Sequence, residues 1–219
     1  MAGIKLIITG ATGMVGEGVL FECLQNQKVI EVLIINRRHY ECDHPKLKEL
    51  IVPDFFNLQE FAESIKGYDA CFFCAGVSSI GMKEDKYAHI TYHTTLSFAK
   101  TLLMYNSNMI FIYVSGSGTD SSEKGRMMWA RVKGKTENEL MKLPFKAVYN
   151  FRPGIMLPFE GQKNWKSIYK SIAKAIKMFV PKNVLTIQQV GKAMINAATT
   201  GYPSSILEIS DIKKLAGEP

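Results

Sequence analysis

The chain has 219 residues, of which 47% are hydrophobic and 21% charged, with 17 glycines and 8 prolines. This length fits one domain of ordinary size, and the composition excludes a disordered, collagen-like or low-complexity chain. The formal net charge is +7. Nucleic acid, an anionic membrane and a phosphorylated ligand all suit such a charge, so its position along the chain has to decide between them.

No segment has the roughly 18 uninterrupted apolar residues that a membrane-spanning helix needs. Only four apolar residues follow Gly3 before Thr9, which is too few for the apolar region of a signal peptide. Four cysteines in a chain of this length are typical of reduced core residues rather than of a disulfide framework. We therefore expect a cytoplasmic protein without a transmembrane segment.

Short apolar runs recur along the chain, with helical patterns between them. Most of these runs lack polar alternation, which is typical of parallel strands covered by helices on both faces. They span 4–9, 32–35, 50–52, 70–75, 109–114 and 147–151, and a later run at 206–209 would be a seventh. The sequence therefore predicts an α/β fold with a doubly wound parallel sheet of six to seven strands.

Apolar residues at helical spacing predict the helices between the strands. The predicted ranges are 15–24, 57–67, 87–105, about 164–179 and 187–200. Asn57, with Glu60 three residues later, is expected to cap the second of them. Thr186 and Gln189 have the spacing of a capping box at the start of the last.

Residues 1–219 are expected to form a single domain. About 65 residues follow the sixth strand, which is too few for an independent domain. We expect residues 154–219 to include a small lid or substrate subdomain over the carboxyl edge of the sheet.

The predicted helix 164–179 and its flanks hold most of the surplus positive charge. Its lysines and apolar residues form two separate sets, Lys163, Lys166, Lys170, Lys174, Lys177 and Lys182 against Trp165, Ile168, Ile172, Ile176 and Phe179. Such a helix either packs its apolar stripe on the sheet or contacts a partner, which includes a homodimer. No nucleic-acid-binding module is recognisable, so no nucleic-acid partner is expected.

A glycine-rich turn directly after the first strand, residues 9–16, is the strongest signal in the sequence. Gly10 permits a tight turn, Gly13 lets a pyrophosphate approach the backbone, and Gly16 lets the following helix pack closely on the strand. The amino terminus of that helix offers free N–H groups to phosphates. We expect a dinucleotide cofactor to be bound here, by Gly10, Thr12, Gly13, Met14, Val15 and Gly16.

The residues after the second strand indicate which dinucleotide is preferred. An acid at this position selects NAD, whereas basic residues accommodate the 2′-phosphate of NADP. Asn36, Arg37 and Arg38 stand here, with no carboxylate before Glu41, so NADP(H) is the predicted preference and NAD(H) the alternative. Two solvated arginines at a strand end are the other interpretation. The remaining predicted contacts are Asp54 and Phe55 beside the adenine, and Cys74, Ala75 and Gly76 beside a sugar.

Several short motifs occur in the order found in atypical and extended short-chain dehydrogenases. They are residues 9–16, 74–76, 115–118, Lys133 and 151–154. The chain resembles this superfamily along nearly its whole length, and more narrowly the branch with the Tat-interacting protein and bacterial relatives similar to NAD-dependent epimerases and dehydratases. The resemblance implies a Rossmann sheet, a small carbonyl or hydroxyl substrate, and cofactor contacts from Lys133, Pro153, Gly154 and Ile155.

The resemblance also implies a catalytic group made of a serine, a tyrosine and a lysine four residues after the tyrosine. Ser115 and Ser117 are both candidates for the serine that polarises the substrate oxygen, and Lys133 stands at the lysine position. Trp129 occupies the tyrosine position. An indole N–H does not exchange protons near neutral pH, so the usual proton transfer lacks its phenol.

Two functions therefore remain open. The first is an NAD(P)H-dependent oxidoreductase or epimerase-like enzyme in which Tyr87, Tyr113 or Tyr149 supplies the phenol, or Trp129 stacks on the nicotinamide or the substrate. The second is a non-catalytic NADP(H) sensor or partner-binding regulatory protein.

Two further patterns have structural interpretations. Cys71 and Cys74 lie in a predicted strand, where residues three apart point to opposite faces, so core packing is expected instead of redox chemistry. His89 and His93 stand one helical turn apart without an evident third ligand. No metal site is therefore expected.

Overall fold

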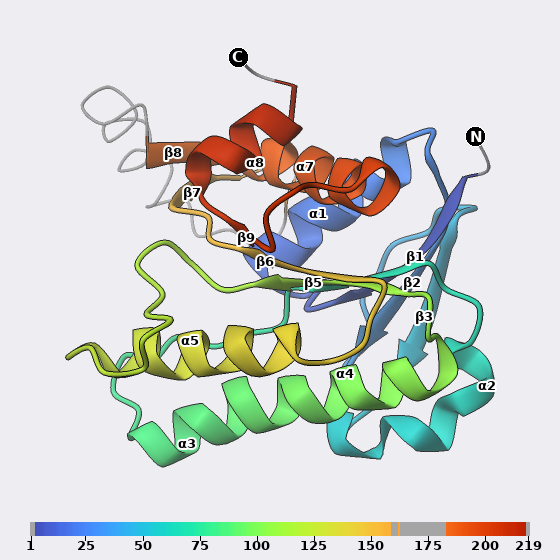
Figure 1. Cartoon of the computed structure of the whole chain (residues 1–219). Coiled ribbons are helices and arrows are strands. Elements are labelled where there is room, and N and C mark those ends of the chain that lie inside the picture. The colour runs from blue at the N-terminus through green and yellow to red at the C-terminus, as the bar shows by residue number, and fades with distance from the viewer. Residues whose placement is uncertain (1–2, 159–161, 163–182, 218–219) are drawn as a thin grey trace.

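A computed structural model describes residues 3–158, 162 and 183–217, and shows a central sheet between two layers of helices (Figure 1). The sheet has seven strands in the order β3-β2-β1-β4-β5-β6-β9, and every neighbouring pair is parallel. These strands are β1 (Ile4–Thr9), β2 (Val29–Asn36), β3 (Leu47–Ile51), β4 (Ala70–Phe73), β5 (Ile110–Val114), β6 (Ala147–Phe151) and β9 (Ile206–Leu207). The predicted doubly wound Rossmann sheet is confirmed.

The helices follow the strands in alternation. They are α1 (Met14–Gln25), the 3-10 segment η1 (Phe55–Phe61), α2 (Ala62–Ile65), α3 (Glu84–Ala88), the π-helical segment η2 (His89–His93), α4 (Thr94–Tyr105), α5 (Met128–Met141), α7 (Ile187–Thr200) and α8 (Ile209–Leu215). A separate two-stranded parallel sheet pairs β7 (Ile155–Leu157) with β8 (Val184–Thr186).

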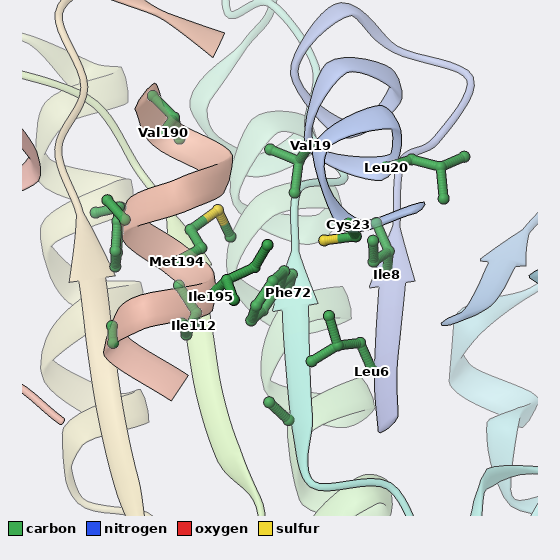
Figure 2. Packing of buried hydrophobic residues seen from close by; sticks show 14 of the residues in the cluster. Leu6, Ile8, Val19, Leu20, Cys23, Phe72, Ile112, Val190, Met194 and Ile195 are labelled. Atoms are coloured by element: carbon green, nitrogen blue, oxygen red, sulfur yellow. The ribbon is translucent and has the colours of Figure 1, made fainter. Parts of the chain in front are cut away.

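The core has two halves, one on each face of the sheet. Along β1, Leu6 and Ile8 belong to the face covered by α1, α7 and α8, while Ile7 belongs to the face covered by η1, α2, α4 and α5. Figure 2 shows Ile195 of α7 beside Phe72 of β4 on the first face. Each such side chain contributes about 1.5–3 kcal/mol when fully buried, so both helical layers are tied to the strands.

The region predicted as one helix over 57–67 is divided into η1 and α2. The carboxylate of Asp54 accepts a hydrogen bond of 3.0 Å from the backbone N–H two residues later, so the helical region starts earlier than predicted. Asn57 lies inside η1 with non-helical angles, φ −98° and ψ 18°, and its predicted capping role is wrong. Phe55 and Leu58 are both buried, and their spacing of three residues fits a 3-10 turn.

The carboxy-terminal elements begin at capping boxes. Thr186 Oγ1 accepts from the N–H of Gln189 at 3.1 Å, and Gln189 Oε1 accepts from the N–H of Thr186 at 2.5 Å, which confirms the predicted start of α7. Glu208 and Asp211 form a second capping box, at the start of α8. The predicted strand at 206–209 is therefore only two residues long.

Much of the carboxy-terminal region belongs to the central layers. Helix α7 packs so closely on α1 that a Cβ on Gly191 would lie 2.8 Å from Glu22 Cβ. Strand β9 is the edge strand next to β6 in the central sheet. The lid role of residues 154–219 stays a prediction. The expected basic helix 164–179 lies outside the described residues.

Candidate functional site

A cleft of about 640 Å³ opens at the carboxyl edge of the sheet. It receives residues from the start of α1, the segments after β4 and β5, α5, and the segment around β7. The strand order reverses between β1 and β4 at this edge, which is where doubly wound sheets bind their ligands. The predicted site residues that line the cleft are Gly13, Met14, Val15, Cys74, Ala75, Gly76, Ser115, Ser117, Lys133, Pro153, Gly154 and Ile155.

The other predicted site residues do not line the cleft. They are Gly10, Thr12, Gly16, Asn36, Arg37, Arg38, Asp54, Phe55 and Trp129. Gly10 and Gly16 shape the backbone, and the residues after β2 and β3 stand farther along the carboxyl edge.

The three glycines of the turn have different structural roles. Gly10 has φ +74°, and a Cβ there would lie 2.7 Å from the backbone nitrogen of Ala75. A Cβ on Gly16 would lie 2.2 Å from the carbonyl oxygen of Gly10, which confirms the predicted close packing of helix on strand. Gly13 has an extended conformation, φ −107° and ψ 162°, and the nearest atom to its Cβ position is 3.4 Å away. A side chain at Gly13 would therefore not clash with the rest of the fold, but it would fill space in the cleft.

The amino terminus of α1 fits a phosphate. Gly13 precedes the helix and provides no side-chain cap, while its carbonyl oxygen accepts from the N–H of Glu17 at 2.9 Å. The first N–H groups of the helix are left as donors at a positive dipole end, beside the cleft. A dinucleotide pyrophosphate would meet these donors where a Cβ on Gly13 would otherwise stand.

The loop after β2 is held by Tyr40. Its hydroxyl donates to the buried carboxylate of Glu17 at 3.0 Å, and its backbone N–H donates to Glu49 of β3 at 2.8 Å. Arg37 and Arg38 are exposed in this loop, and neither has an ion-pair partner among the described residues. Two guanidinium groups are thus presented by an anchored loop.

Glu49 also contacts the residue at the end of β2. Asn36 is buried, and its Nδ2 donates to Glu49 Oε1 at 3.3 Å, while its Oδ1 has no partner among the residues that the structure describes. Buried amide oxygens are usually hydrogen-bonded to protein groups or ordered water. The sequence did not indicate Glu49, because the acid comes from the neighbouring strand and not from the segment after β2.

The residues predicted to border the adenine are committed mainly to the fold. Asp54 caps η1, and the ring of Phe55 is buried against Phe98, with ring centroids 5.1 Å apart. After β4, the N–H of Ala75 donates to Thr9 Oγ1 at 3.2 Å, which holds that segment against β1.

The two candidate serines have different environments. Ser115 is buried, and its hydroxyl donates to Glu137 Oε1 at 2.5 Å. Ser117 is exposed at the cleft, and its backbone N–H donates to the carbonyl oxygen of Pro153 at 2.9 Å. The hydroxyl of Ser117 is thus better placed to meet a substrate oxygen.

Lys133 enters the cleft from α5 and is fixed at the end of β5. Its Nζ donates to the carbonyl oxygen of Ser115. Burial lowers the pKa of Lys133 to about 8, although the nearby Glu137 carboxylate opposes this shift. Trp129, one turn earlier on α5, packs beside Gly118, whose Cβ position lies 3.7 Å from the indole ring.

A buried ion pair that the sequence analysis missed lies behind these residues. The carboxylate of Glu137 is fully buried, and Arg152 donates to it from Nε at 3.1 Å and from Nη2. Arg152 also donates to Ser121 Oγ at 2.5 Å and to Glu208 Oε1 at 3.1 Å. The network joins α5, the end of β6, the loop before α5 and the cap of α8. The sequence signal that could have indicated Glu137 is its position four residues after Lys133, one helical turn along α5.

Two of the three candidate phenols line the cleft. Tyr87 and Tyr113 are buried at its wall, and burial raises the pKa of both. Tyr149 belongs to the core on the other face and accepts from the N–H of Tyr202 at 3.0 Å. Tyr149 does not line the cleft.

No cluster of three or more potential metal ligands occurs within residues 3–158, 162 and 183–217. His89 stacks on Phe56, with ring centroids 5.3 Å apart. Cys71 packs on one face of the sheet and Cys74 against the other, and both are free thiols, so the predicted core packing is confirmed.

The fold and the cleft together define a dinucleotide-binding α/β protein of the Rossmann type. Residues 6–123 match the NAD dependent epimerase/dehydratase family, and the chain belongs to this family. This match confirms the resemblance to short-chain dehydrogenases that the sequence motifs indicated.

Individual relatives agree with this assignment. The chain is similar to protein HTATIP2 of Rattus norvegicus, 28% identical over 159 residues, covering 72% of this chain and 64% of the rat protein. It is similar to FMP52-2, mitochondrial, of Scheffersomyces stipitis, 25% identical over 211 residues, covering 92% of this chain and 90% of that protein. The chain thus spans just under two thirds of the rat protein's length.

A solved structure shares the fold at low sequence identity. The NAD⁺ complex of the Bordetella bronchiseptica enzyme WbmF superimposes with a TM-score of 0.70 at 15% identity, covering 99% of this chain and 79% of that one. Within the part of the chain that the structure describes, no helix is long and apolar enough to cross a membrane.

Proposed function

We propose that the protein is an NADP(H)-dependent oxidoreductase that acts on a small carbonyl or hydroxyl substrate. The observation that carries this proposal is the cleft itself, where the open Gly13 turn, Ser117 and Lys133 meet at the reversal of strand order. The cofactor, when bound, supplies or accepts a hydride at its nicotinamide. The chain contributes position and electrostatics around that reaction.

Each cleft residue has a distinct part in this proposal. The N–H groups at the start of α1, after Gly13, hold the phosphates. Lys133 holds the nicotinamide ribose from a fixed position beside Ser115, and the exposed Ser117 polarises the substrate oxygen with its hydroxyl. Pro153 and Gly154 form the wall beyond the nicotinamide.

The preference for NADP(H) rests on Arg37 and Arg38. Both are exposed, follow β2 directly, and have no ion-pair partner among the described residues, so two guanidinium groups are free to bind a 2′-phosphate. NAD(H), which lacks this phosphate, would gain nothing from them.

Calorimetric titration with NADPH and NADH tests this preference. The native protein should bind NADPH at least tenfold more tightly, and Arg37→Ala/Arg38→Ala should remove that advantage while leaving NADH affinity unchanged. Arg126→Ala, an exposed arginine that does not line the cleft, is the control. Equal affinities in the native protein, or an unchanged ratio in the double variant, contradict the preference.

Trp129 favours a second function, a non-catalytic NADP(H) sensor that binds a partner. A panel of aldehydes and ketones with NADPH, applied to the native protein and to Trp129→Tyr, separates the two. Turnover only in Trp129→Tyr supports the sensor, and turnover in the native protein excludes it. We also propose a homodimer or partner contact through residues 164–179. A cytoplasmic location is a further proposal, although the name of the fungal relative FMP52-2 includes the word mitochondrial.

A further inference from the structure

Among the residues that the structure describes, four titratable side chains line the cleft, and none of them is a carboxylate or a histidine. They are Cys74 after β4, Tyr87 on α3, Tyr113 on β5 and Lys133 on α5. A reaction that moves a hydride between carbon atoms also moves a proton to or from the substrate oxygen. The group that carries this proton has to touch the cleft.

Lys133 is placed to contact that oxygen. It lies one helical turn after Trp129 on α5, and its Nζ donates to the carbonyl oxygen of Ser115 at the end of β5. An ammonium group has three N–H donors, so this hydrogen bond leaves two of them. Ser117, the other group proposed to meet the substrate oxygen, follows Ser115 by two residues and lines the same cleft.

We propose that Lys133 itself exchanges the proton with the substrate oxygen, in the role of the tyrosine that Trp129 replaces. This inference rests on the proposed oxidoreductase function. Lys133 is then a catalytic residue as well as a residue that holds the cofactor.

The charge states of the cleft support this assignment. Burial raises the pKa of Cys74 to about 12 and raises the pKa of Tyr87 and Tyr113 further from neutrality, so these three groups stay protonated. Burial lowers the pKa of Lys133 to about 8 against the opposing Glu137 carboxylate, which is itself paired with Arg152. Proton exchange is most efficient when the pKa lies near the working pH.

The step balances as a reduction by NAD(P)H. The reduced cofactor gives a hydride to the carbonyl carbon of the substrate and becomes oxidised. An N–H bond of the Lys133 ammonium breaks as an O–H bond forms on the substrate oxygen, and Nζ keeps the electron pair as a neutral amine. Water then returns a proton to Nζ, and the oxidation of an alcohol follows the reverse path.

Amine labelling measures the first requirement without any turnover. The full-length protein is treated with a small amount of acetic anhydride between pH 6 and 11, and each lysine is quantified by peptide mass spectrometry. Labelling of Lys133 should be half-maximal near pH 8, relative to Lys135, an exposed lysine of the same helix. Half-maximal labelling of Lys133 at pH 10 or above overturns the proposal.

Kinetics with NADPH and the carbonyl panel measure the second requirement. The kcat/KM of reduction should fall tenfold per pH unit above about pH 8, because the ammonium must be protonated to act as the acid. Lys133→Arg keeps the cation but does not release its proton, so kcat should fall at least 100-fold. The calorimetric NADPH affinity of this variant should change less than tenfold.

The outcomes separate the inference from the function on which it rests. Failure of the native protein to bind NADPH contradicts the proposed function itself. NADPH binding without turnover of any carbonyl compound contradicts the oxidoreductase function and with it the role of Lys133. A kcat of Lys133→Arg within tenfold of native overturns only the role of Lys133. Loss of the pH 8 inflection in Tyr87→Phe, with the inflection kept in Lys133→Arg, transfers the role to the phenol and also overturns the proposal.

Discussion

Replacement of Arg152 by methionine should destabilise the protein more than the loss of one surface ion pair would. Arg152→Met keeps an unbranched apolar stem of similar length but removes the guanidinium donors to the fully buried carboxylate of Glu137, while the hydrogen bond from the Ser115 hydroxyl stays in place. It also removes the hydrogen bonds to Ser121 and Glu208. The variant therefore leaves a buried negative charge without its cation.

The burial of the pair fixes the size of the effect. The side chain of Glu137 is 0% exposed and that of Arg152 is 10% exposed. Removing one partner of such a buried pair costs about 3–5 kcal/mol, whereas an exposed pair contributes roughly 0–1 kcal/mol. In a domain of this size, 1 kcal/mol lowers Tm by about 2–4 °C, so the expected fall is on the order of 10 °C.

Urea denaturation followed by circular dichroism measures this cost. The midpoint should fall in Arg152→Met with an unchanged m-value. Glu137→Gln/Arg152→Met should recover about 2 kcal/mol, because the double variant no longer buries a charge. A loss below 1 kcal/mol in Arg152→Met, or no recovery in the double variant, refutes the reasoning.

Three other changes test separate parts of the structure. Gly16→Ala places a Cβ 2.2 Å from the carbonyl oxygen of Gly10 and should cost at least 1–3 kcal/mol by thermal unfolding; an unchanged Tm excludes the close contact. Thr186→Ala removes the cap of α7 and should cost about 0.5–2 kcal/mol by urea denaturation, with Thr186→Ser as the near-native control. Native stability relative to Lys133→Met should rise between pH 8 and 10, by on the order of 1 kcal/mol per pH unit, because the unfolded lysine keeps a proton that the folded one releases near pH 8. A flat difference between the two urea midpoints contradicts that linkage.

The order of the elements was predictable because it depends on local patterns. Unbroken apolar runs marked the parallel strands, and three glycines marked the turn between β1 and α1. The capping box at Thr186 was equally local, since both of its hydrogen bonds join residues three apart. The capping role assigned to Asn57 was wrong because Asp54, three residues earlier, competes for the same function.

The parts of the site that depend on long-range contacts were not predictable. The pairing of Glu137 with Arg152 joins residues 15 apart, and Glu49 meets Asn36 only because β3 lies beside β2. The sequence also left Ser115 and Ser117 equivalent, and the buried hydrogen bond from Ser115 to Glu137 distinguishes them. Only the folded cleft shows which titratable groups share one wall.

Binding of the dinucleotide at the glycine-rich turn is the central claim, and calorimetric titration of the native protein and Gly13→Val with NADPH tests it most directly. Gly13 has an extended conformation and an open Cβ position, so valine should leave Tm nearly unchanged while its side chain occupies the place of the pyrophosphate. The account predicts saturable one-to-one binding to the native protein and at least a 100-fold loss of affinity in Gly13→Val. Equal affinities for the two proteins, or no binding to the native protein at millimolar NADPH, would contradict it.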